Sequence, residues 1–406
     1  MHFREMLTMK IAGIVAEYNP FHNGHALHIA KTREMLGEDA SIVCVMSGNF
    51  IQRGETAILE KHVRAAAALC GGADLVLELP CPWAVSSAER FAYGAMALLD
   101  SLGCVDNVSF GCECGDAGEL REAAALLLDE AFGEFLRAEL RRGVSFAAAR
   151  QAALERMSGR SFELLEKPNN ILAVEYIKAL MRLSSTMEPL AILRHGAGHD
   201  EAEARGGLRS ASAIRAVLAA GGNISGDVPR AAMALYSAAM AAGRGPVTME
   251  RAELSVLTRL RTMSETEFAR LPDMSEGLHL RLMRAARNAG SLEELYESVK
   301  TKRYALARIR RAVLCAWLGI SSADAVEAPP YARVLAANGR GRAVLKAAKK
   351  NIPVITKPAL ARRLDERGGA LFELEARADD LYALCFAGTE NRRGGPEWEL
   401  SPVIRD

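Results

Sequence analysis

Two histidines, His22 and His25, flank Asn23 and Gly24 near the start of the chain, and their spacing points to ligand chemistry. A short apolar run, residues 11–16, precedes them and is typical of a buried strand, while apolar side chains follow them at helical spacing. The edge of an open parallel sheet where a strand leads into a helix is where ligands bind. Because a helix start offers free N–H groups and partial positive charge, this stretch predicts a phosphate site, and Gly24 would let a ligand approach the backbone closely.

Capping or metal binding is the alternative role for these histidines. A lone histidine here is usually a surface or cap residue, but two around Asn-Gly at a strand-to-helix junction favour ligand binding. No Cys/His cluster stands nearby, and helical metal pairs are spaced about four residues apart, so we predict no metal site. The eight cysteines are scattered without a C-x-x-C pair, which indicates reduced thiols, and the role of Cys112 and Cys114 stays open.

A second loop should face the same edge of the sheet. Residues 41–46 are typical of another buried strand, and the loop after it contains small and polar residues and an arginine. A helix predicted over residues 57–70 carries a lysine in its first turn, where the helix dipole does not favour a cation. An anionic ligand or a solvated helix face would each explain that lysine. The residues that could contact phosphate or substrate here are Ser47, Gly48, Asn49, Arg53 and Lys61.

Three more apolar runs, residues 74–79, 105–110 and 189–193, complete a pattern of five strands alternating with helices. This pattern predicts an α/β fold with a doubly wound, parallel, five-stranded sheet. Residues of about 116–165 read as a helical insertion. We therefore expect a first domain over residues 9–225, with ligand-binding residues at the carboxyl ends of its strands.

Strand patterns stop beyond that point, and residues 226–406 predict a second, all-helical domain. Two groups of basic residues lie within it, although the whole chain has a net charge of only +1. A solvated helix face explains either group alone, but two groups in one domain favour a surface for nucleic acid. The candidate tRNA-binding residues are Lys302, Arg303, Arg308, Arg310, Arg311, Arg340 and Arg342.

The composition is that of an ordinary soluble protein, with 406 residues, 50% of them hydrophobic and 25% charged. We find no apolar run long enough to span a bilayer and no secretory signal, so we expect a cytoplasmic protein without a membrane partner. The sequence leaves open the oligomeric state and whether Met1 or Met9 is the start.

Several motifs resemble one known family, the tRNA(Met) cytidine acetate ligases of the HxGH nucleotidyltransferase superfamily. The longest are GIVAEYNPFHNGH and MSGNFIQRGE, and shorter ones are ADLVLELP, FGCE, KPNN, SASAIR, TKRYALARIRR and ANGRGRAVL. The resemblance implies a nucleotidyltransferase (HUP/Rossmann-like) sheet and an ATP-dependent ligase. It also implies that ATP, with Mg²⁺, and acetate form acetyl-adenylate and pyrophosphate. The acetyl group then passes to the exocyclic amine of the wobble cytidine in elongator tRNA(Met), giving N4-acetylcytidine.

The resemblance also implies roles for individual residues. His22 and His25 would be catalytic, stabilising the charge that develops as pyrophosphate leaves. In the second superfamily signature, matched here by SASAIR, a helix start and an arginine hold the outer phosphates, which implicates Ser210 and Arg215. The implied ATP-binding residues are Val15, Ala16, Glu17, Tyr18, Asn19, Pro20, Phe21, His22, Asn23, Gly24, His25, Ala26, Leu27, His28, Gly111, Asn169 and Arg194.

A different enzyme class also fits the first domain. A small-molecule adenylyltransferase that makes a nucleotide cofactor would use the same ATP chemistry, with the helical domain serving only in oligomerisation. The basic groups of the second domain favour the tRNA ligase. The residues alone identify neither the carboxylic acid that is activated nor the tRNA that is chosen.

Overall fold

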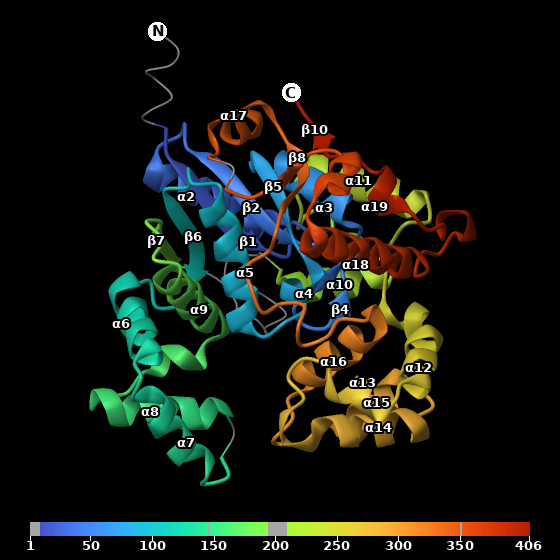
Figure 1. Ribbon diagram of the computed structural model, residues 1–406. Coiled ribbons are helices and arrows are strands. Elements are labelled where there is room, and N and C mark those ends of the chain that lie inside the picture. The colour runs from blue at the N-terminus through green and yellow to red at the C-terminus, as the bar shows by residue number, and fades with distance from the viewer. Residues whose placement is uncertain (1–8, 145, 194–208, 350) are drawn as a thin grey trace.

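The computed structural model describes residues 9–144, 146–193, 209–349 and 351–406. Its centre is an eight-stranded sheet in the order β10-β8-β5-β2-β1-β6-β7, with β9 beside β8 (Figure 1). Five of these strands are mutually parallel and match the five predicted strands. They are β1 (Ile11–Ala16), β2 (Ser41–Ser47), β5 (Leu75–Leu79), β6 (Asn107–Cys112) and β7 (Glu188–Leu193).

The α/β class with a mainly parallel sheet is confirmed, but the strand number and the all-helical C-terminal region are wrong. Residues from the end of the chain add β8 (Ala332–Ala337), β9 (Val354–Ile355) and β10 (Val403–Ile404). Strand β8 lies antiparallel beside β5 and is buried along its whole length. A strand buried on both faces shows no polar alternation, and its sequence ARVLAA also suits a helix, so the pattern could not identify it.

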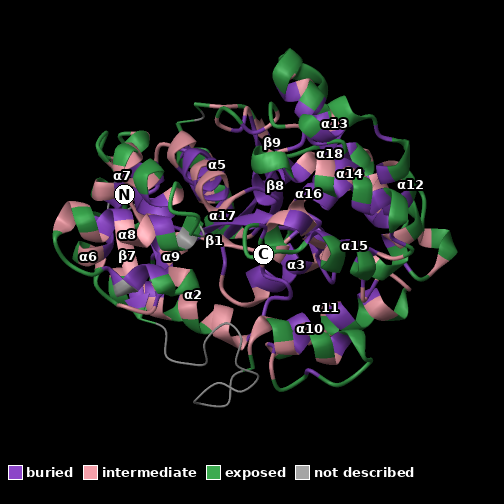
Figure 2. Cartoon of the chain, turned by 90° about the horizontal axis from the view of Figure 1, so that it is seen from below, coloured by how far each residue is buried: buried purple, intermediate pink, exposed green. Residues whose placement is uncertain are grey.

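Helices cover both faces of the sheet because successive strand residues point to opposite sides. Val43 and Val45 of β2 pack toward α5 (Ala88–Ser101) and α9 (Pro168–Arg182). Ile42 and Cys44 pack toward the other layer. That layer contains α2 (Asn23–Leu36), α3 (Lys61–Cys70), α10 (Ala211–Ala219) and α11 (Arg230–Ala241). Buried residues gather around the sheet and exposed ones on the outer helices (Figure 2).

The order of the strands reverses beside β1. The chain runs from β1 to β2 and β5 on one side, and then returns to β6 and β7 on the other. Such a reversal opens a crevice at the carboxyl ends of the two strands involved, which here are β1 and β6. Between β6 and α9 the predicted insertion region folds as three helices, α6 (Ala117–Leu128), α7 (Phe132–Leu140) and α8 (Phe146–Ser158), at the lower left of Figure 1.

A group of five helices lies beyond the carboxyl edge of the sheet, at the lower right of Figure 1. Its members are α12 (Glu253–Thr262), α13 (Glu265–Ala269), α14 (Leu278–Asn288), α15 (Leu292–Val299) and α16 (Leu306–Leu318). Their apolar core also takes in Phe50 from the loop after β2 and Tyr382 from α18 (Glu366–Ala383). The group is therefore packed against the rest of the chain on two sides.

Short elements complete the fold. They are β3 (Phe50–Ile51), β4 (Glu55–Thr56), α4 (Cys81–Ala84), α17 (Gly339–Ala347), α19 (Pro396–Glu399) and the 3₁₀ turns η1 (Glu163–Glu166), η2 (Met249–Ala252), η3 (Ser275–Gly277), η4 (Pro358–Arg363) and η5 (Thr389–Asn391). None of the helices in the described ranges combines the length and apolar character that crossing a bilayer requires.

Candidate active site

The two histidines build the start of α2. His22 is the residue before the helix, and its Nδ1 accepts a hydrogen bond from the Gly24 N–H at 3.0 Å. A reciprocal hydrogen bond joins the two residues, since Nδ1 of His25 accepts from the His22 backbone N–H at 3.3 Å. Their ring centroids lie 3.8 Å apart. A neutral imidazole whose Nδ1 accepts carries its proton on Nε2, so this geometry makes Nε2–H the donor of each ring.

Gly24 is needed for a reason that the sequence did not reveal. A Cβ at this position would lie 2.8 Å from Cε1 of the His22 ring. The absence of a side chain therefore lets the capping imidazole fold over the first turn of α2. The space beside Gly24 is therefore taken by this ring and not, as the sequence had predicted, by a ligand.

Two arginines fix the loop between β1 and α2. Arg64 of α3 is completely buried and donates to the Glu17 carbonyl at 2.6 Å and to the Ser47 carbonyl at 3.2 Å. Arg215 of α10 donates to the Asn19 carbonyl at 2.9 Å. Because each guanidinium can hold several carbonyls at fixed angles, the loop that follows β1 is held from two helices at once.

A cavity of about 210 Å³ opens at the carboxyl ends of β1 and β6, where the strand order reverses. One wall is apolar and aromatic, with Phe91 of α5, Phe110 of β6 and Tyr176 of α9. The other wall is polar and includes Arg53 and Arg215. An apolar slot next to two cations and a helix start suits a purine joined to a chain of phosphates, so the residues present fit ATP.

Many of the predicted residues line this cavity, and others lie behind it. Those on its wall are Val15, Ala16, Glu17, Tyr18, Asn19, His25, His28, Arg53, Gly111, Asn169 and Arg215. Phe21 is completely buried in the core, whereas Leu27 is exposed. Ser210 caps α10 by accepting from the Ala213 N–H. Arg194 lies outside the described residues.

The structure places four predicted phosphate contacts away from the cavity, in a buried ionic cluster. Lys61 is only 1% exposed, and its ammonium lies 2.8 Å from Glu78, 2.9 Å from Asp379 and 2.6 Å from Glu397. The Asn49 side chain joins this cluster, since it donates to Asp379 at 2.8 Å and accepts from the Lys61 N–H at 2.7 Å.

The other two residues of that set lie in the same buried region. A Cβ on Gly48 would overlap the Glu78 carboxylate, and the Ser47 hydroxyl is buried without a hydrogen-bond partner among the described residues. The prediction for Ser47, Gly48, Asn49 and Lys61 is corrected here. The physical reason is that two of the three carboxylates around Lys61 come from α18 and α19, more than 300 residues later in the chain.

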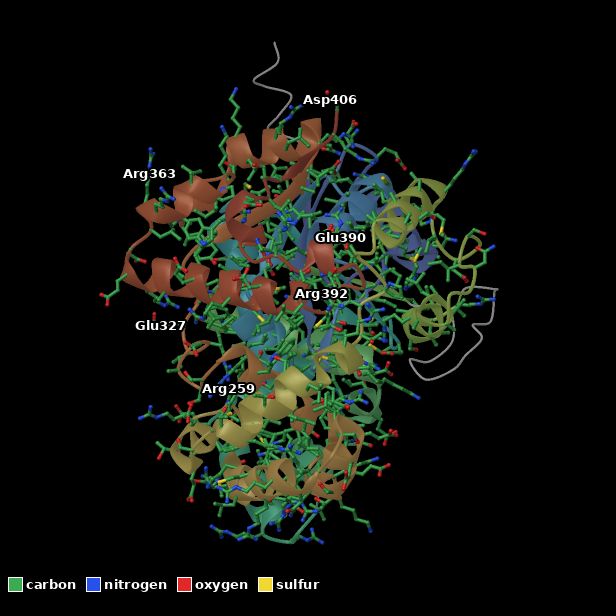
Figure 3. The ribbon with its side chains drawn as sticks, turned by 90° about the vertical axis from the view of Figure 1, so that its right-hand side faces the viewer. Arg259, Glu327, Arg363, Glu390, Arg392 and Asp406 are labelled. Carbon is green, nitrogen blue, oxygen red and sulfur yellow. The ribbon has the colours of Figure 1, made fainter. Side chains whose placement is uncertain are left out.

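The two groups of basic residues do not form one surface. Arg308, Arg310 and Arg311 lie on α16 in the five-helix group, whereas Arg340 and Arg342 lie on α17 at the opposite end of the sheet (Figure 1). Figure 3 shows the same separation, because Asp406, the partner of Arg342 at 3.1 Å, lies far above Arg259 of α12.

Most of these basic side chains have partners within the protein. Arg308 donates to the Asp273 carbonyl at 2.6 Å, and Arg310 is ion-paired with Glu55. Arg311 is partly buried, and burial lowers its pKa. Lys302 and Arg303 are exposed. The prediction of a single basic patch is therefore wrong, and the exposed pair before α16 is its remaining part.

Several cavity residues were missed by the sequence analysis. Phe91, Phe110, Leu172 and Tyr176 read as core residues because apolar side chains at helical or strand spacing give the same pattern in a core and in a pocket wall. Gln52 was detectable, since it precedes Arg53 in the motif MSGNFIQRGE. In the described part of the chain, no three His, Cys, Asp or Glu side chains come together in a way that would hold a metal.

The chain is similar to known proteins over nearly its whole length. Residues 9–396 match the family model described as HIGH Nucleotidyl Transferase. A tRNA(Met) cytidine acetate ligase from Acetivibrio thermocellus is 38% identical, over 98% of this chain and 100% of the relative. One from Caldicellulosiruptor saccharolyticus is 40% identical, over 93% of this chain and 94% of the relative.

Solved structures are similar over the same length. Thermotoga maritima TmcAL in its apo form superposes with a TM-score of 0.93 at 34% identity, over 98% of this chain and 99% of that protein. The structure of TmcAL bound with alpha-thio ATP superposes with a TM-score of 0.90 at 33% identity, again over 98% and 99% of the two chains.

Proposed function

Since the chain belongs to the HIGH nucleotidyl transferase family, and within it to the tRNA(Met) cytidine acetate ligases, we propose that it is an ATP-dependent ligase that acetylates elongator tRNA(Met). The acceptor is the exocyclic amine of the wobble cytidine, and the product is N4-acetylcytidine. The observation that carries the proposal is the cavity at the carboxyl ends of β1 and β6, with an apolar slot on one side and cations with the start of α2 on the other.

In the first step the carboxylate of acetate attacks the α-phosphorus of ATP, and pyrophosphate leaves. His25 and Arg215 line the cavity, and the His22 ring lies behind His25 with its centroid 3.8 Å away. The start of α2 and Arg215 would hold the departing phosphates, and the two imidazoles would donate to the developing charge through Nε2–H. In the second step the cytidine amine attacks the acetyl carbon, and AMP leaves. Neither step requires a covalent enzyme intermediate.

Several finer points belong to the proposal. Mg²⁺ would enter on the phosphates of ATP, where it neutralises charge and polarises the phosphoryl oxygens. Residues 9–225 would form the catalytic domain, and the helical part of residues 226–406 would bind tRNA.

The protein would act in the cytoplasm. Arg194 would contact ATP, as the family resemblance implies.

Pyrophosphate exchange tests the first step. The purified protein should incorporate labelled pyrophosphate into ATP when acetate is present. With total tRNA added, mass spectrometry of the nucleosides should then show N4-acetylcytidine. Propionate adds one methylene and should be about 10–200-fold less effective in a tight pocket.

The opposite result would identify the alternative enzyme. Exchange that ignores every small carboxylate, with or without tRNA, but responds to a phosphorylated cofactor precursor would overturn the ligase proposal. A small-molecule adenylyltransferase would then replace it.

A further inference from the structure

Among the described residues that line the cavity, Glu17 alone carries a carboxylate. Its Oε1 accepts a hydrogen bond from the Gln52 backbone N–H at 2.8 Å. It forms no ion pair with any described arginine, although Arg53 and Arg215 lie close enough to act on it through space. Its Oε2 makes no hydrogen bond to a described residue and is not closed off from the cavity. Glu17 thus lines the cavity with one carboxylate oxygen that has no hydrogen-bond partner among the described residues.

The negative charge of Glu17 is energetically unfavourable in this cavity. The surrounding groups, Arg53, Arg215 and the start of α2, form a site for anions, and a negative side chain among them repels phosphate. Removing a carboxylate from water costs free energy as well, and among the described residues one backbone N–H is its only hydrogen-bond donor. Glutamine at this position would keep the size and the hydrogen-bond acceptor without the charge, so the charge itself calls for a chemical role.

The second step of the proposed reaction needs a proton acceptor. The lone pair of the cytidine amine is delocalised into the ring, so the amine is a weak nucleophile and must lose a proton as its bond to carbon forms. The other titratable groups on the wall are unsuited to take this proton. Nδ1 of His25 already accepts from His22, and Nε2 of His28 lies 3.0 Å from the Ser109 hydroxyl. Burial raises the pKa of both Tyr18 and Tyr176.

We propose that Glu17 is the general base of the acetyl-transfer step, an inference that rests on the proposed function. The amine nitrogen forms a bond to the acetyl carbon, and the bond from that carbon to the phosphate oxygen of acetyl-adenylate breaks. The proton of the amine passes to Oε2 of Glu17, and AMP leaves with the electron pair of the broken bond. The Gln52 N–H keeps the carboxylate oriented through Oε1.

The electrostatic surroundings support this role. Burial raises the pKa of Glu17, while the hydrogen bond from Gln52 and the charges of Arg215, Arg53 and Arg64 oppose the rise. A general base works best when its pKa lies near the working pH, so a raised pKa makes Glu17 a stronger acceptor than a surface carboxylate. The groups that face it are Gln52 and Arg53 after β3, Arg64 of α3, Arg215 of α10, Tyr176 of α9 and His25 of α2.

Glu17→Gln separates the two steps of the reaction. Acetate-dependent exchange of pyrophosphate into ATP reports only the first step, and N4-acetylcytidine formation on tRNA reports both. The variant should lower the ratio of the transfer rate to the exchange rate, since no proton moves to Glu17 in the exchange step and any change in ATP binding affects both activities. Acetyl transfer in a single turnover should fall by about 100-fold or more, the usual contribution of a general base. Glu17→Asp, which restores the charge, should recover part of the loss.

Glu60→Gln is the matched control, because Glu60 is a largely buried carboxylate next to α3 that does not line the cavity. It should leave both activities unchanged. Retained exchange also establishes that Glu17→Gln is folded. If Glu17→Gln loses exchange and transfer equally, or keeps transfer, the base assignment is overturned while the ligase function stands. If the wild type shows neither activity with acetate, the proposed function fails, and the assignment of Glu17 fails with it.

Discussion

At the scale of single residues, the imidazoles of His22 and His25 combine two duties on different atoms. Each Nδ1 accepts a backbone N–H and so fixes the first turn of α2. Each Nε2–H is then the donor that can meet a phosphate oxygen. The capping alternative and the catalytic role are therefore compatible, and variants can separate them because asparagine caps a helix well without an imidazole.

We expect His22→Asn and His22→Ala to lose activity alike but to differ in stability. Each should lower the acetate-dependent exchange rate by about 100-fold or more, because a donor to the departing phosphates is lost. His22→Ala should also lower the free energy of unfolding by about 1 kcal/mol through loss of the cap, whereas His22→Asn should stay close to the wild type. Exchange assays and denaturant unfolding measure the two effects.

His25 lines the cavity, so His25→Ala removes a donor that faces the substrates directly. It should lower the exchange rate by as much as the His22 variants do. Near-wild-type exchange in His22→Asn and His25→Ala would remove both imidazoles from the mechanism. Equal stability of His22→Ala and His22→Asn would instead show that the capping hydrogen bond contributes little.

At the scale of elements, the buried cluster around Lys61 joins α3 and β5 to α18 and α19. Arg333 of β8 is a second buried cation, 2.8 Å from Glu397, but two cations cannot neutralise all the buried carboxylates of the cluster. Burial opposes ionisation of Glu397, but Lys61 and Arg333 outweigh it and hold the pKa of Glu397 at about 2. Burial raises the pKa of Asp379 to about 8, even though Lys61 opposes the rise. Asp379 is therefore largely protonated in the folded protein near neutral pH.

Because the pKa of Asp379 is raised in the folded protein, the free energy of unfolding should depend on pH. Between the ordinary pKa of an aspartate and about 8, folded Asp379 keeps a proton that the unfolded chain has lost. The free energy of unfolding should therefore fall as the pH rises, by up to about 1.4 kcal/mol per pH unit for one proton. His62, whose pKa burial lowers to about 3, acts in the opposite direction, but only below its ordinary pKa near 6.5. Denaturant unfolding between about pH 7.5 and 8 largely avoids that contribution, because an ordinary histidine is then mostly neutral.

Asp379→Asn should flatten the fall in this window. Glu78 and Glu375, whose pKa values burial also raises, would account for any slope that remains. Glu373→Gln is the control, since this carboxylate is exposed on the same helix and should leave the slope unchanged. A slope that is identical in the wild type and Asp379→Asn would mean that Asp379 is ionised in the folded protein.

At the scale of the whole molecule, the cavity opens at the carboxyl ends of β1 and β6. The five-helix group lies beyond these strand ends, and α17 lies at the opposite end of the strands (Figure 1). Arg310 of α16 pairs with Glu55 of β4, which places α16 beside the hairpin that carries Arg53. An RNA that reaches the cavity would therefore meet the helical group and would not meet α17. Lys302 and Arg303 are exposed basic residues of this group that could contact phosphate.

Replacing Lys302 and Arg303 together with alanine should weaken tRNA binding and reduce its salt dependence. The slope of log affinity against log salt should become smaller by about two, one unit for each lost phosphate contact. The affinity for ATP should not change, because neither side chain lines the cavity. Binding assays at several salt concentrations give both numbers.

The matched control removes the same charge from the other end of the sheet. The double variant Arg340→Ala, Arg342→Ala should change tRNA binding much less. Both side chains already form ion pairs within the protein, Arg340 with Asp39 and Arg342 with Asp406. Equal effects of the two double variants would indicate a tRNA path that runs along the whole molecule.

Features carried by short stretches of sequence could be predicted without the structure. The five parallel strands have continuous apolar runs of the right length, and the His22–His25 turn is built from neighbours three residues apart. Periodicity and helix capping depend on such local spacing. The walls formed by β1, its following loop and Gly111 could be placed for the same reason, since parallel strands align their carboxyl ends.

Only the tertiary structure decided the rest, because it depends on contacts between residues hundreds of positions apart. Lys61 looked like a phosphate ligand until carboxylates from α18 and α19 enclosed it. Strand β8 has no local pattern that distinguishes it from a buried helix, and only its place beside β5 makes it a strand. The two basic groups lie about 30 to 40 residues apart in the sequence, yet packing carries them to opposite edges of one sheet, where no single surface can hold both.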